Sequence, residues 1–257
     1  MFTSDDIIIS DQLNHASIID GIKLCKAKKV IYKHMNFKHL EQILKASMHY
    51  DKRCIVTEGV FSMDADIVDL KSIVKLAKKY NAIIFLDDCH GVGVVGKTGR
   101  GTPEYCGVPM SDVDAYVATM GKGLSGGGGG YITGSYGVVT WIKQRSRTYI
   151  FSNALCPVIV NCARKAIEIL SEHPNILEEH RAKGMRFRTG MRKNGFTIMG
   201  NDDCPICPVL IKDELWCRKI ELELLQRGVY VIAVGYPVTA LGTARMRIII
   251  QSGHTNE

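Results

Sequence analysis

Apolar residues recur in two alternating patterns along the first half of the chain. Short, nearly continuous apolar runs predict buried strands, and these runs are RCIVTEGVF (53–61), NAIIFLDD (81–88) and VDAYVATM (113–120). Between the first two, VDLKSIVKLAKKY (68–80) carries its apolar residues at the spacing of an amphipathic helix. Strands of this kind joined by helical crossovers predict an α/β fold with a parallel sheet covered on both faces.

The texture changes after about residue 155. PVIVNCARKAIEILSEH (157–173) predicts a long helix, and HRAKGMRFRTGMRKNGF (180–196) reads as a connecting segment. A second α/β segment follows, with strands CPVLI (207–211), VYVIAV (229–234) and ARMRIIIQS (244–252) and a helix ELWCRKIELELLQRG (214–228). We therefore expect a large domain over residues 1–155 and a smaller C-terminal α/β domain over 156–257.

Polar motifs stand where the predicted strands of the first half end. They are EGVFSMD, DDCH and TMGK. In open parallel sheets ligands bind outside the carboxyl ends of the strands, so these motifs mark the candidate site. Asp87 and His90 lie in the second motif and Lys122 in the third, while Asp88 is expected to point to the opposite side of the strand from Asp87. A buried acid, an imidazole and a lysine at neighbouring strand ends are the parts that bind a pyridine cofactor as a Schiff base. A turn-capping acid and an ordinary loop histidine are the alternative for an isolated DDxH.

The glycine run around Lys122, TMGKGLSGGGGG (119–130), excludes two phosphate-binding loops. A P-loop needs a glycine five residues before its Gly-Lys pair and a Ser or Thr after the lysine, whereas Tyr116 and Gly123 occupy those positions. The run does not open a helical pattern, so the dinucleotide-binding fingerprint also fails. A flexible linker remains an alternative.

Composition and charge narrow the class further. The chain of 257 residues is 46% hydrophobic and has a formal charge of +7. No apolar run approaches the roughly 18 residues that span a membrane, and the scattered basic residues suit small anions better than nucleic acid. Nine cysteines in a chain of this size indicate a reducing compartment. Cys204 and Cys207 have CxxC spacing, but without a second ligand pair they are expected to be structural, and we expect no metal site.

Six longer stretches extend the motifs from one end of the chain to the other. They are SDQLNHASIIDGIKLCKA, EGVFSMDADIVDL, DDCHGVGVVGKTGRGTPEYCGV, TMGKGLSGGGGGYITG, RSRTYIFSNAL and GYPVTALGTARMRIIIQSGHT. Together they resemble the α-oxoamine synthases, pyridoxal-phosphate-dependent enzymes of fold type I. The resemblance implies a three-layer α/β/α large domain of the aspartate-aminotransferase kind that binds pyridoxal 5'-phosphate, plus a smaller C-terminal domain.

Four catalytic residues follow from the resemblance. Lys122 would bind the cofactor covalently and move the substrate's Cα proton. Asp87 would keep the pyridine nitrogen protonated, and His90 would hydrogen-bond the phenolic oxygen. His15 of LNHAS would stack on the ring, although by itself it could be an ordinary histidine at a helix start.

Four further residues take supporting roles by the same resemblance. Ser62 would lie beside the phenolic oxygen, and Thr119 would bind the cofactor phosphate. Ser152 of YIFSN would contact the phosphate bound by another subunit, which implies a homodimer. Taken alone, Ser62 and Thr119 are equally explained as turn or strand-end hydroxyls. Arg247 would clamp the substrate carboxylate, and because it alternates with Arg245 along a strand, we expect one of the two to face solvent.

Within the family, NHASIIDGIKLCKA and RTYIFSN favour the glycine C-acetyltransferases. Their reaction joins glycine and acetyl-CoA into 2-amino-3-oxobutyrate and CoA, and in the cell runs mainly as the reverse cleavage during threonine breakdown. 8-Amino-7-oxononanoate synthase, 5-aminolevulinate synthase and serine palmitoyltransferase share the cofactor residues and are the alternatives.

The family members are longer than this chain. The resemblance leads us to expect a further segment before Met1, which supplies part of the small domain and a phosphate-binding turn, and terminal helices after Glu257. An inactive fragment that acts only as a dimerising partner is therefore the alternative from another functional class. The family is mitochondrial in animals and otherwise cytoplasmic, so the compartment depends on the source.

Overall fold

The computed structural model describes residues 1–124 and 127–255, which form two compact units. Residues 1–61 and 68–172 form the first unit, and residues 62–67 and 173–257 form the second. The predicted domain boundary at 155/156 precedes the helix 157–172, whereas the compact units divide after that helix. The division into a cofactor-binding domain and a small domain stays a prediction.

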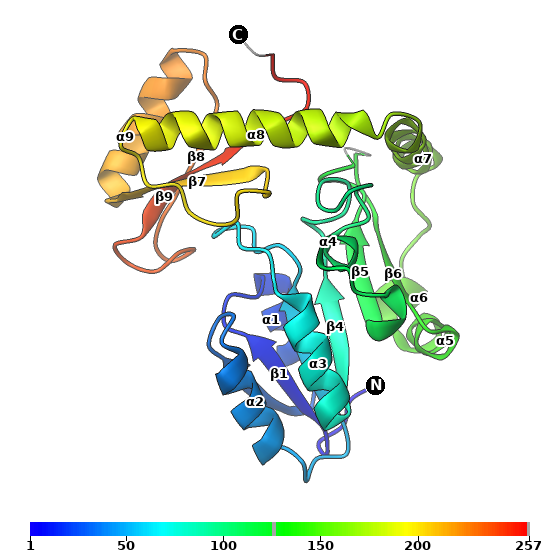
Figure 1. The fold of residues 1–257 in the computed structure, drawn as a ribbon. Helices are drawn as coiled ribbons and strands as arrows, with labels where there is room; N and C mark the ends of the chain where they lie inside the picture. Colours follow the sequence, from blue (N-terminus) through cyan, green and yellow to red (C-terminus); the bar gives the residue numbers. More distant parts are fainter. Residues whose placement is uncertain (125–126, 256–257) are drawn as a thin grey trace. The chain divides into compact units, whose positions relative to one another are not determined.

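The first unit contains a six-stranded sheet in the order β2-β1-β3-β4-β5-β6 (Figure 1). Its strands are β1 Ile7–Asp11, β2 Lys28–Tyr32, β3 Arg53–Glu58, β4 Ala82–Asp87, β5 Ala115–Thr119 and β6 Gly130–Gly134. The first five strands are mutually parallel, and β6 pairs antiparallel with β5 at the edge. The prediction of a parallel sheet built from the apolar runs is therefore confirmed.

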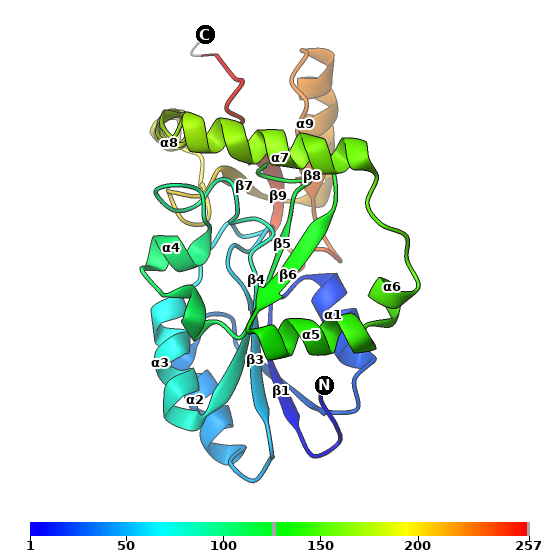
Figure 2. The same ribbon diagram turned by 90° about the vertical axis from the view of Figure 1, so that its right-hand side faces the viewer.

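Helices cover both faces of this sheet. They are α1 Ala16–Lys23, α2 Phe37–Ala46, α3 Leu70–Tyr80, α4 Thr102–Cys106, α5 Tyr136–Arg145, α6 Arg147–Ile150 and α7 Pro157–Glu172, with a 3₁₀ turn η1 at Met110–Asp112. Helices α2 and α3 lie on one face and α1 on the other (Figure 2). The strand period of two explains this division, because Ile7 and Ile9 pack in the cluster with α2 and α3, while Ile8 packs with Ile18 of α1. The predicted three-layer α/β/α arrangement is confirmed.

The second unit has a three-stranded antiparallel sheet in the order β7-β9-β8. Its elements are α8 Asn175–Lys193, β7 Ile206–Lys212, α9 Glu214–Gln226, β8 Ile232–Val234 and β9 Ala244–Ile249. Its core contains Val209 of β7, Cys217 of α9 and Met246 of β9. The predicted smaller α/β arrangement is confirmed.

Helix α8 covers residues that the sequence pattern assigned to a connecting segment, so that assignment is wrong. Its buried positions are Leu177, His180, Gly184 and Arg188, which follow helical spacing. Three of these four are not hydrophobic, so hydrophobic periodicity cannot detect the buried stripe. Both polar side chains hydrogen-bond to distant backbone carbonyls: His180 Nε2 lies 2.7 Å from the carbonyl of Ile250, and the two terminal nitrogens of Arg188 donate to three carbonyls of residues 199–206.

Across residues 1–124 and 127–255, the helices are all too short or too polar to cross a membrane.

Candidate active site

The carboxyl ends of the parallel strands lie along one side of the sheet, which we call the strand edge. Four neighbouring strands of the first unit end there in polar residues. Asp11, Glu58, Asp87 and Thr119 are the last residues of β1, β3, β4 and β5. Because these strands are parallel and adjacent, their carboxyl ends gather the four side chains along the edge where ligands bind in such sheets. Asp87 and Thr119 were named as site residues from the sequence, whereas Asp11 and Glu58 were not, although Glu58 belongs to the EGVFSMD motif expected at this edge.

Lys122 and His90 meet at this edge. The Lys122 Nζ lies 3.0 Å from the His90 Nε2. The two residues come from loops that follow β5 and β4, and they are brought together by close packing of those loops. The sequence prediction that these residues lie together is met by this geometry.

Glycine makes that loop packing feasible. A Cβ on Gly123 would lie 2.5 Å from the carbonyl oxygen of Val92, and a Cβ on Gly93 would lie 2.9 Å from the backbone of Gly123. Gly93 also has a positive φ of 84°, which disfavours other residues. The glycine next to Lys122 therefore allows backbone contact that presents the lysine to His90.

The described residues that flank the glycine run form an antiparallel pair of strands. Strands β5 and β6 pair on both sides of it, and the Met120 N–H donates to the Gly129 carbonyl at 2.9 Å. The run therefore connects two paired strands of one sheet, which does not favour the flexible-linker alternative. Ser125 and Gly126 lie outside the described residues.

Asp87 and Asp88 point in different directions, as the strand pleat predicts. Asp87 is half-buried, and its Oδ1 accepts the Cys89 N–H at 3.0 Å. Asp88 is fully buried and accepts three hydrogen bonds, from the Thr102 N–H at 2.7 Å, the Thr102 hydroxyl at 2.6 Å and the Tyr116 hydroxyl at 2.9 Å. Asp87 is therefore the member of the pair at the candidate site, and Asp88 anchors the following loop.

The Asp88 carboxyl fills a space that only glycines leave open. A Cβ on any of three residues would lie within 2.2 Å of its oxygens, and these are Gly59, Gly91 and Gly101. Burial raises the pKa of Asp88 to about 6, although the three donors oppose that shift. This buried carboxyl links Thr102 at the start of α4 to Tyr116 of β5 and lies against Gly59, the residue after β3.

Glu58 is a site residue that the sequence reasoning missed. It is 4% exposed, and its Oε1 accepts the backbone N–H of His15 at 2.5 Å. Burial, and next the charge of Asp87, raise the pKa of Glu58 to about 8, while Lys122 opposes the shift. The signal was present in the sequence, because Glu58 opens the EGVFSMD motif at a predicted strand end.

His15 caps the first turn of α1. Its Nδ1 accepts the Ser17 N–H at 3.2 Å and lies 2.8 Å from the Ser17 hydroxyl. Its side chain is exposed. The helix-start geometry is thus present, and an exposed ring beside the strand edge is also compatible with stacking on a ligand, so the stacking role stays a prediction.

The two predicted phosphate contacts have different surroundings. The Thr119 hydroxyl donates to the Gly129 carbonyl at 2.9 Å and accepts the Gly121 N–H at 3.2 Å, so here it ties the glycine loop to β5. Ser152 lies exposed in the turn after α6. Phosphate binding by either residue stays a prediction.

Ser62 and Arg247 meet in the second unit. The half-buried Arg247 donates through Nε to the Ser62 carbonyl at 2.8 Å, and burial lowers its pKa. Arg245 is 3% exposed and donates to the Met63 carbonyl at 3.0 Å and the Asp64 carboxylate at 2.8 Å. The expectation that one of the two arginines faces solvent is wrong, because residues two apart on a strand share a face and both contact residues 62–64.

The nine cysteines are free thiols. Cys204 and Cys207 are buried, and burial raises the pKa of Cys204 to about 12. Thiols of this kind are poor nucleophiles. Over the described part of the chain, no group of three or more His, Cys, Asp or Glu side chains is arranged to hold a metal ion.

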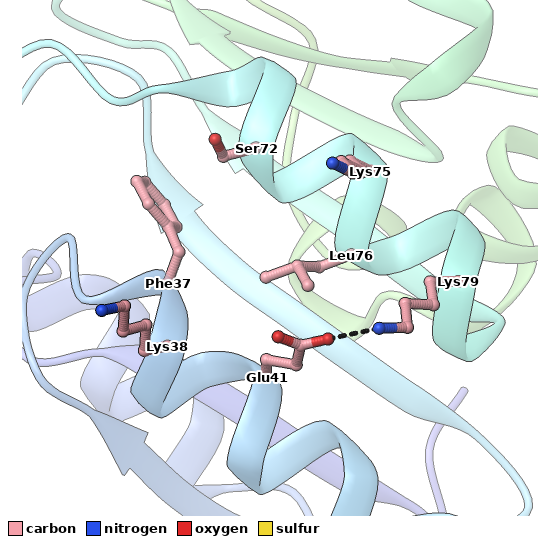
Figure 3. Close-up of a pocket in the computed structure, with 7 residues that line it drawn as sticks. All are labelled: Phe37, Lys38, Glu41, Ser72, Lys75, Leu76 and Lys79. Carbon is pink, nitrogen blue, oxygen red and sulfur yellow. Dashed lines mark hydrogen bonds and ion pairs between the residues drawn. The ribbon is translucent and has the colours of Figure 1, made fainter.

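A groove of about 310 Å³ lies between α2 and α3 (Figure 3). Its apolar floor comes from Phe37 and Leu76, and its rim carries the ion pair of Lys79 with Glu41 at 2.6 Å. Lysines and one carboxylate that is ion-paired with a lysine supply neither a nucleophile with its base nor an electron sink. This groove is therefore not a candidate active site.

Comparison with protein families places these features in context. The whole chain, residues 1–257, matches the family model described as aminotransferase class I and II. It is 45% identical over 257 residues to the mitochondrial 2-amino-3-ketobutyrate coenzyme A ligase of Mus musculus, and the match covers 100% of this chain and 61% of the mouse protein. The ligase of Escherichia coli K12 is 44% identical over 256 residues, with 99% and 64% covered. 8-Amino-7-oxononanoate synthase 1 of Bacillus velezensis is 42% identical over 257 residues, with 100% and 65% covered.

Solved structures give the same picture. Serine palmitoyltransferase of Sphingomonas wittichii superposes with a TM-score of 0.93 at 29% identity, over 100% of this chain and 64% of that one. A structure of the same kind of enzyme with the PLP internal aldimine superposes with a TM-score of 0.88 at 30% identity, over 98% and 63%. The predicted resemblance and fold class are confirmed. The chain spans less than two thirds of the length of these curated relatives, 61% for the mouse protein.

Proposed function

Because the chain belongs to the aminotransferase class I and II family, we propose that it serves a pyridoxal-phosphate-dependent acyltransferase of the glycine C-acetyltransferase type. The reaction joins glycine and acetyl-CoA into 2-amino-3-oxobutyrate and CoA, and its main direction in the cell is the CoA-dependent cleavage. The main observation behind this proposal is that the Lys122 amine lies 3.0 Å from His90 at the strand edge, where β4 ends with Asp87. The higher identity to the ligases than to the 8-amino-7-oxononanoate synthase supports this choice of substrates.

The residues of the first unit fit pyridoxal 5'-phosphate. Lys122 offers an exposed amine for its aldehyde carbon, Asp87 a half-buried carboxylate for its ring nitrogen, and His90 an imidazole for its phenolic oxygen. The exposed ring of His15 stands ready to stack, while Thr119 and Ser152 are the proposed phosphate contacts. The cofactor, when bound, supplies an electron sink that makes the substrate Cα–H bond acidic.

The chain's own residues then position the substrate and move one proton. Lys122, once its amine is neutral and free, accepts the proton from the Cα of glycine, and His90 next to Nζ keeps that amine in place. In the second unit, Ser62 holds the Nε of Arg247, which leaves the other guanidinium nitrogens to bind the substrate carboxylate.

We further propose that the active protein is a homodimer. Between residues 136 and 158 the first unit leaves large apolar side chains exposed, and these include Tyr136 (87%), Phe151 (74%) and Val158 (68%). Such exposure is typical of surfaces that bind protein partners. The mitochondrion is the proposed compartment for an animal source, in line with the mitochondrial ligases of the mammalian relatives, and the cytoplasm for any other source.

Borohydride labelling tests the cofactor assignment. The purified chain is mixed with pyridoxal phosphate, reduced with borohydride, and mapped by peptide mass spectrometry. We expect a pyridoxyl adduct on Lys122, loss of that adduct and of turnover in Lys122→Ala, and no change in Lys75→Ala, an exposed control lysine on α3. Near-normal activity in Lys122→Ala would show that another residue does this chemistry.

A second assay separates the proposed substrates from the alternatives. Condensation is measured for glycine with acetyl-CoA, alanine with pimeloyl-CoA, glycine with succinyl-CoA and serine with palmitoyl-CoA. We expect the first pair to give the highest kcat/KM. A labelled Lys122 without turnover of any pair would instead favour the inactive dimerising fragment.

A further inference from the structure

The loop before α1 is fixed to β3 by side chains that the proposed chemistry does not use. The ladder between β1 and β3 ends at the pair Ser10 and Val56. Beyond it, the buried Asn14 amide donates to the Val56 carbonyl at 2.8 Å and accepts the Glu58 N–H at 3.1 Å. Asn14 thereby replaces the backbone pairing that the loop has left.

The Glu58 side chain completes this attachment at His15, the residue after Asn14. Its carboxyl accepts the His15 N–H at 2.5 Å across 43 residues of sequence. That N–H belongs to the N-cap of α1 and has no partner within the helix, so the carboxyl satisfies a donor that would otherwise be unpaired. The main chain of His15 is therefore held to the end of β3 by Asn14 on its N-terminal side and by Glu58 at its own amide.

The charges around Glu58 connect it with the residues of the site. Asp11 faces it from β1, Asp87 from β4, Lys122 from the loop after β5, and the His15 amide from the start of α1. Asp87 is its partner in the β3–β4 register. Burial, and next the negative charge of Asp87, make ionisation of Glu58 unfavourable and raise its pKa, so Glu58 holds a proton to higher pH than an ordinary glutamate.

We propose that Glu58, together with Asn14, is a positioning residue that fixes His15 at the strand edge through the His15 main-chain amide. The role of His15 toward the cofactor rests on the proposed function, whereas the clamp on its amide depends on the chain alone. Glu58 itself touches neither cofactor nor substrate in this assignment.

The clamp is measured first on the chain without cofactor. Amide hydrogen exchange at His15 is followed by NMR in the wild type, in Glu58→Ala and Glu58→Gln, and in Glu41→Ala, whose glutamate lies on α2 away from the edge. We expect exchange on the order of 10-fold faster in Glu58→Ala, close to wild-type exchange in Glu58→Gln because its amide oxygen still accepts, and no change in Glu41→Ala. Unchanged exchange in Glu58→Ala would overturn the proposal.

A pH titration keeps the proposal testable if Glu58→Ala does not fold. In the wild type the His15 amide proton shift should follow the ionisation of Glu58, with a midpoint well above that of an ordinary glutamate. In Glu58→Gln this titration should disappear. A His15 amide shift that titrates equally in both proteins would show that Glu58 does not hold this amide.

The circular dichroism of bound pyridoxal phosphate tests the consequence for the site. We expect Glu58→Ala to weaken the visible band, Glu58→Gln to restore it, and Lys122 to be labelled by borohydride in both. An unchanged band in a variant with accelerated exchange would limit Glu58 to a structural role and overturn its positioning role. If the wild type itself binds no pyridoxal phosphate, the proposed function fails, while the exchange result still decides the clamp.

Discussion

Asp87 and Asp88 are adjacent residues of the same type with different surroundings at the candidate site. Asp87 and Asp88 differ by one position, yet Asp87 lies half-buried at the strand edge and Asp88 is fully buried with three donors. The pleat of the strand sends them to opposite sides. A carboxylate that accepts three hydrogen bonds in a closed space contributes to folding, and one left at the edge is available for a ligand.

Substitution of the two aspartates by asparagine should affect two different properties, stability for Asp88 and cofactor binding for Asp87. In Asp88→Asn the new NH₂ group faces a donor of Thr102 or Tyr116, so we expect a loss of about 1–3 kcal/mol in the free energy of unfolding. Asp87→Asn should leave that free energy almost unchanged but weaken pyridoxal phosphate binding. Denaturant unfolding and cofactor titration of both variants check this, and equal effects on stability would contradict it.

Glu58 should make stability depend on pH. Its pKa is raised from 4.5 to about 8 in the folded chain, so the folded state holds a proton that the unfolded state releases above about pH 4.5. The stabilisation from this proton is present in full below that pH and is lost as the pH rises toward 8. Over this range the free energy of unfolding falls by at most ~1.4 kcal/mol per pH unit. Urea unfolding between pH 5 and 8 should therefore be less pH-dependent in Glu58→Gln than in the wild type. Parallel curves for the two proteins would contradict the shift.

At the scale of elements, loops set the site more than the strands do. The strands bring polar side chains to one edge, but the distance between Lys122 and His90 depends on two loops whose backbones touch at Gly93 and Gly123. Helix α8 also depends on a loop, because its buried Arg188 donates to two carbonyls of the loop before β7 and to the carbonyl of Ile206, the first residue of β7.

The loop contact predicts the effect of one methyl group. In Gly123→Ala the new Cβ would meet the Val92 carbonyl oxygen at 2.5 Å, so the loops must separate and Lys122 must move away from His90. We expect a loss of about 1–3 kcal/mol in the free energy of unfolding and weaker pyridoxal phosphate binding. Gly190→Ala in α8 is the control, because its Cβ meets nothing within 4 Å, and it should be neutral or stabilise by about 0.5–1 kcal/mol. Thermal unfolding and cofactor titration of both variants are the measurements.

At the scale of the whole molecule, the two units carry different parts of the proposed chemistry. The first unit holds Lys122, His90 and Asp87, and the second holds Arg247 with Ser62. Short segment 62–67 belongs to the second unit although its neighbours in sequence belong to the first. The exposed apolar side chains of residues 136–158 in the first unit are the surface proposed to contact a second copy.

That surface predicts how the chain associates. Phe151 is 74% exposed in the first unit, and Leu215 is 77% exposed on α9 of the second. If residues 136–158 contact a second copy, Phe151→Glu should shift the protein from dimer to monomer, because a buried unpaired charge is costly, and Leu215→Glu should not. Light scattering after size-exclusion chromatography measures the mass of each variant. A monomeric wild type would contradict the proposed homodimer.

The sequence by itself determined the class of fold and which candidate site residues follow its parallel strands. Nearly continuous apolar runs predicted β3, β4 and β5, and helical apolar spacing predicted α3. In a parallel sheet these elements dictate that Asp87, His90 and Lys122 come from one edge. Buried hydrophobic stripes are visible in the sequence because apolar side chains need only to leave water, so their spacing follows the local period of the strand or helix.

Only the tertiary structure decided which polar groups are buried and what they hold. Helix α8 was missed because its buried stripe contains His180, Gly184 and Arg188, whose burial depends on carbonyl partners supplied by distant segments. Glu58 likewise acquires its role from His15, 43 residues earlier in the chain. Polar burial requires a matching partner, and that match is set by long-range packing rather than by any local pattern.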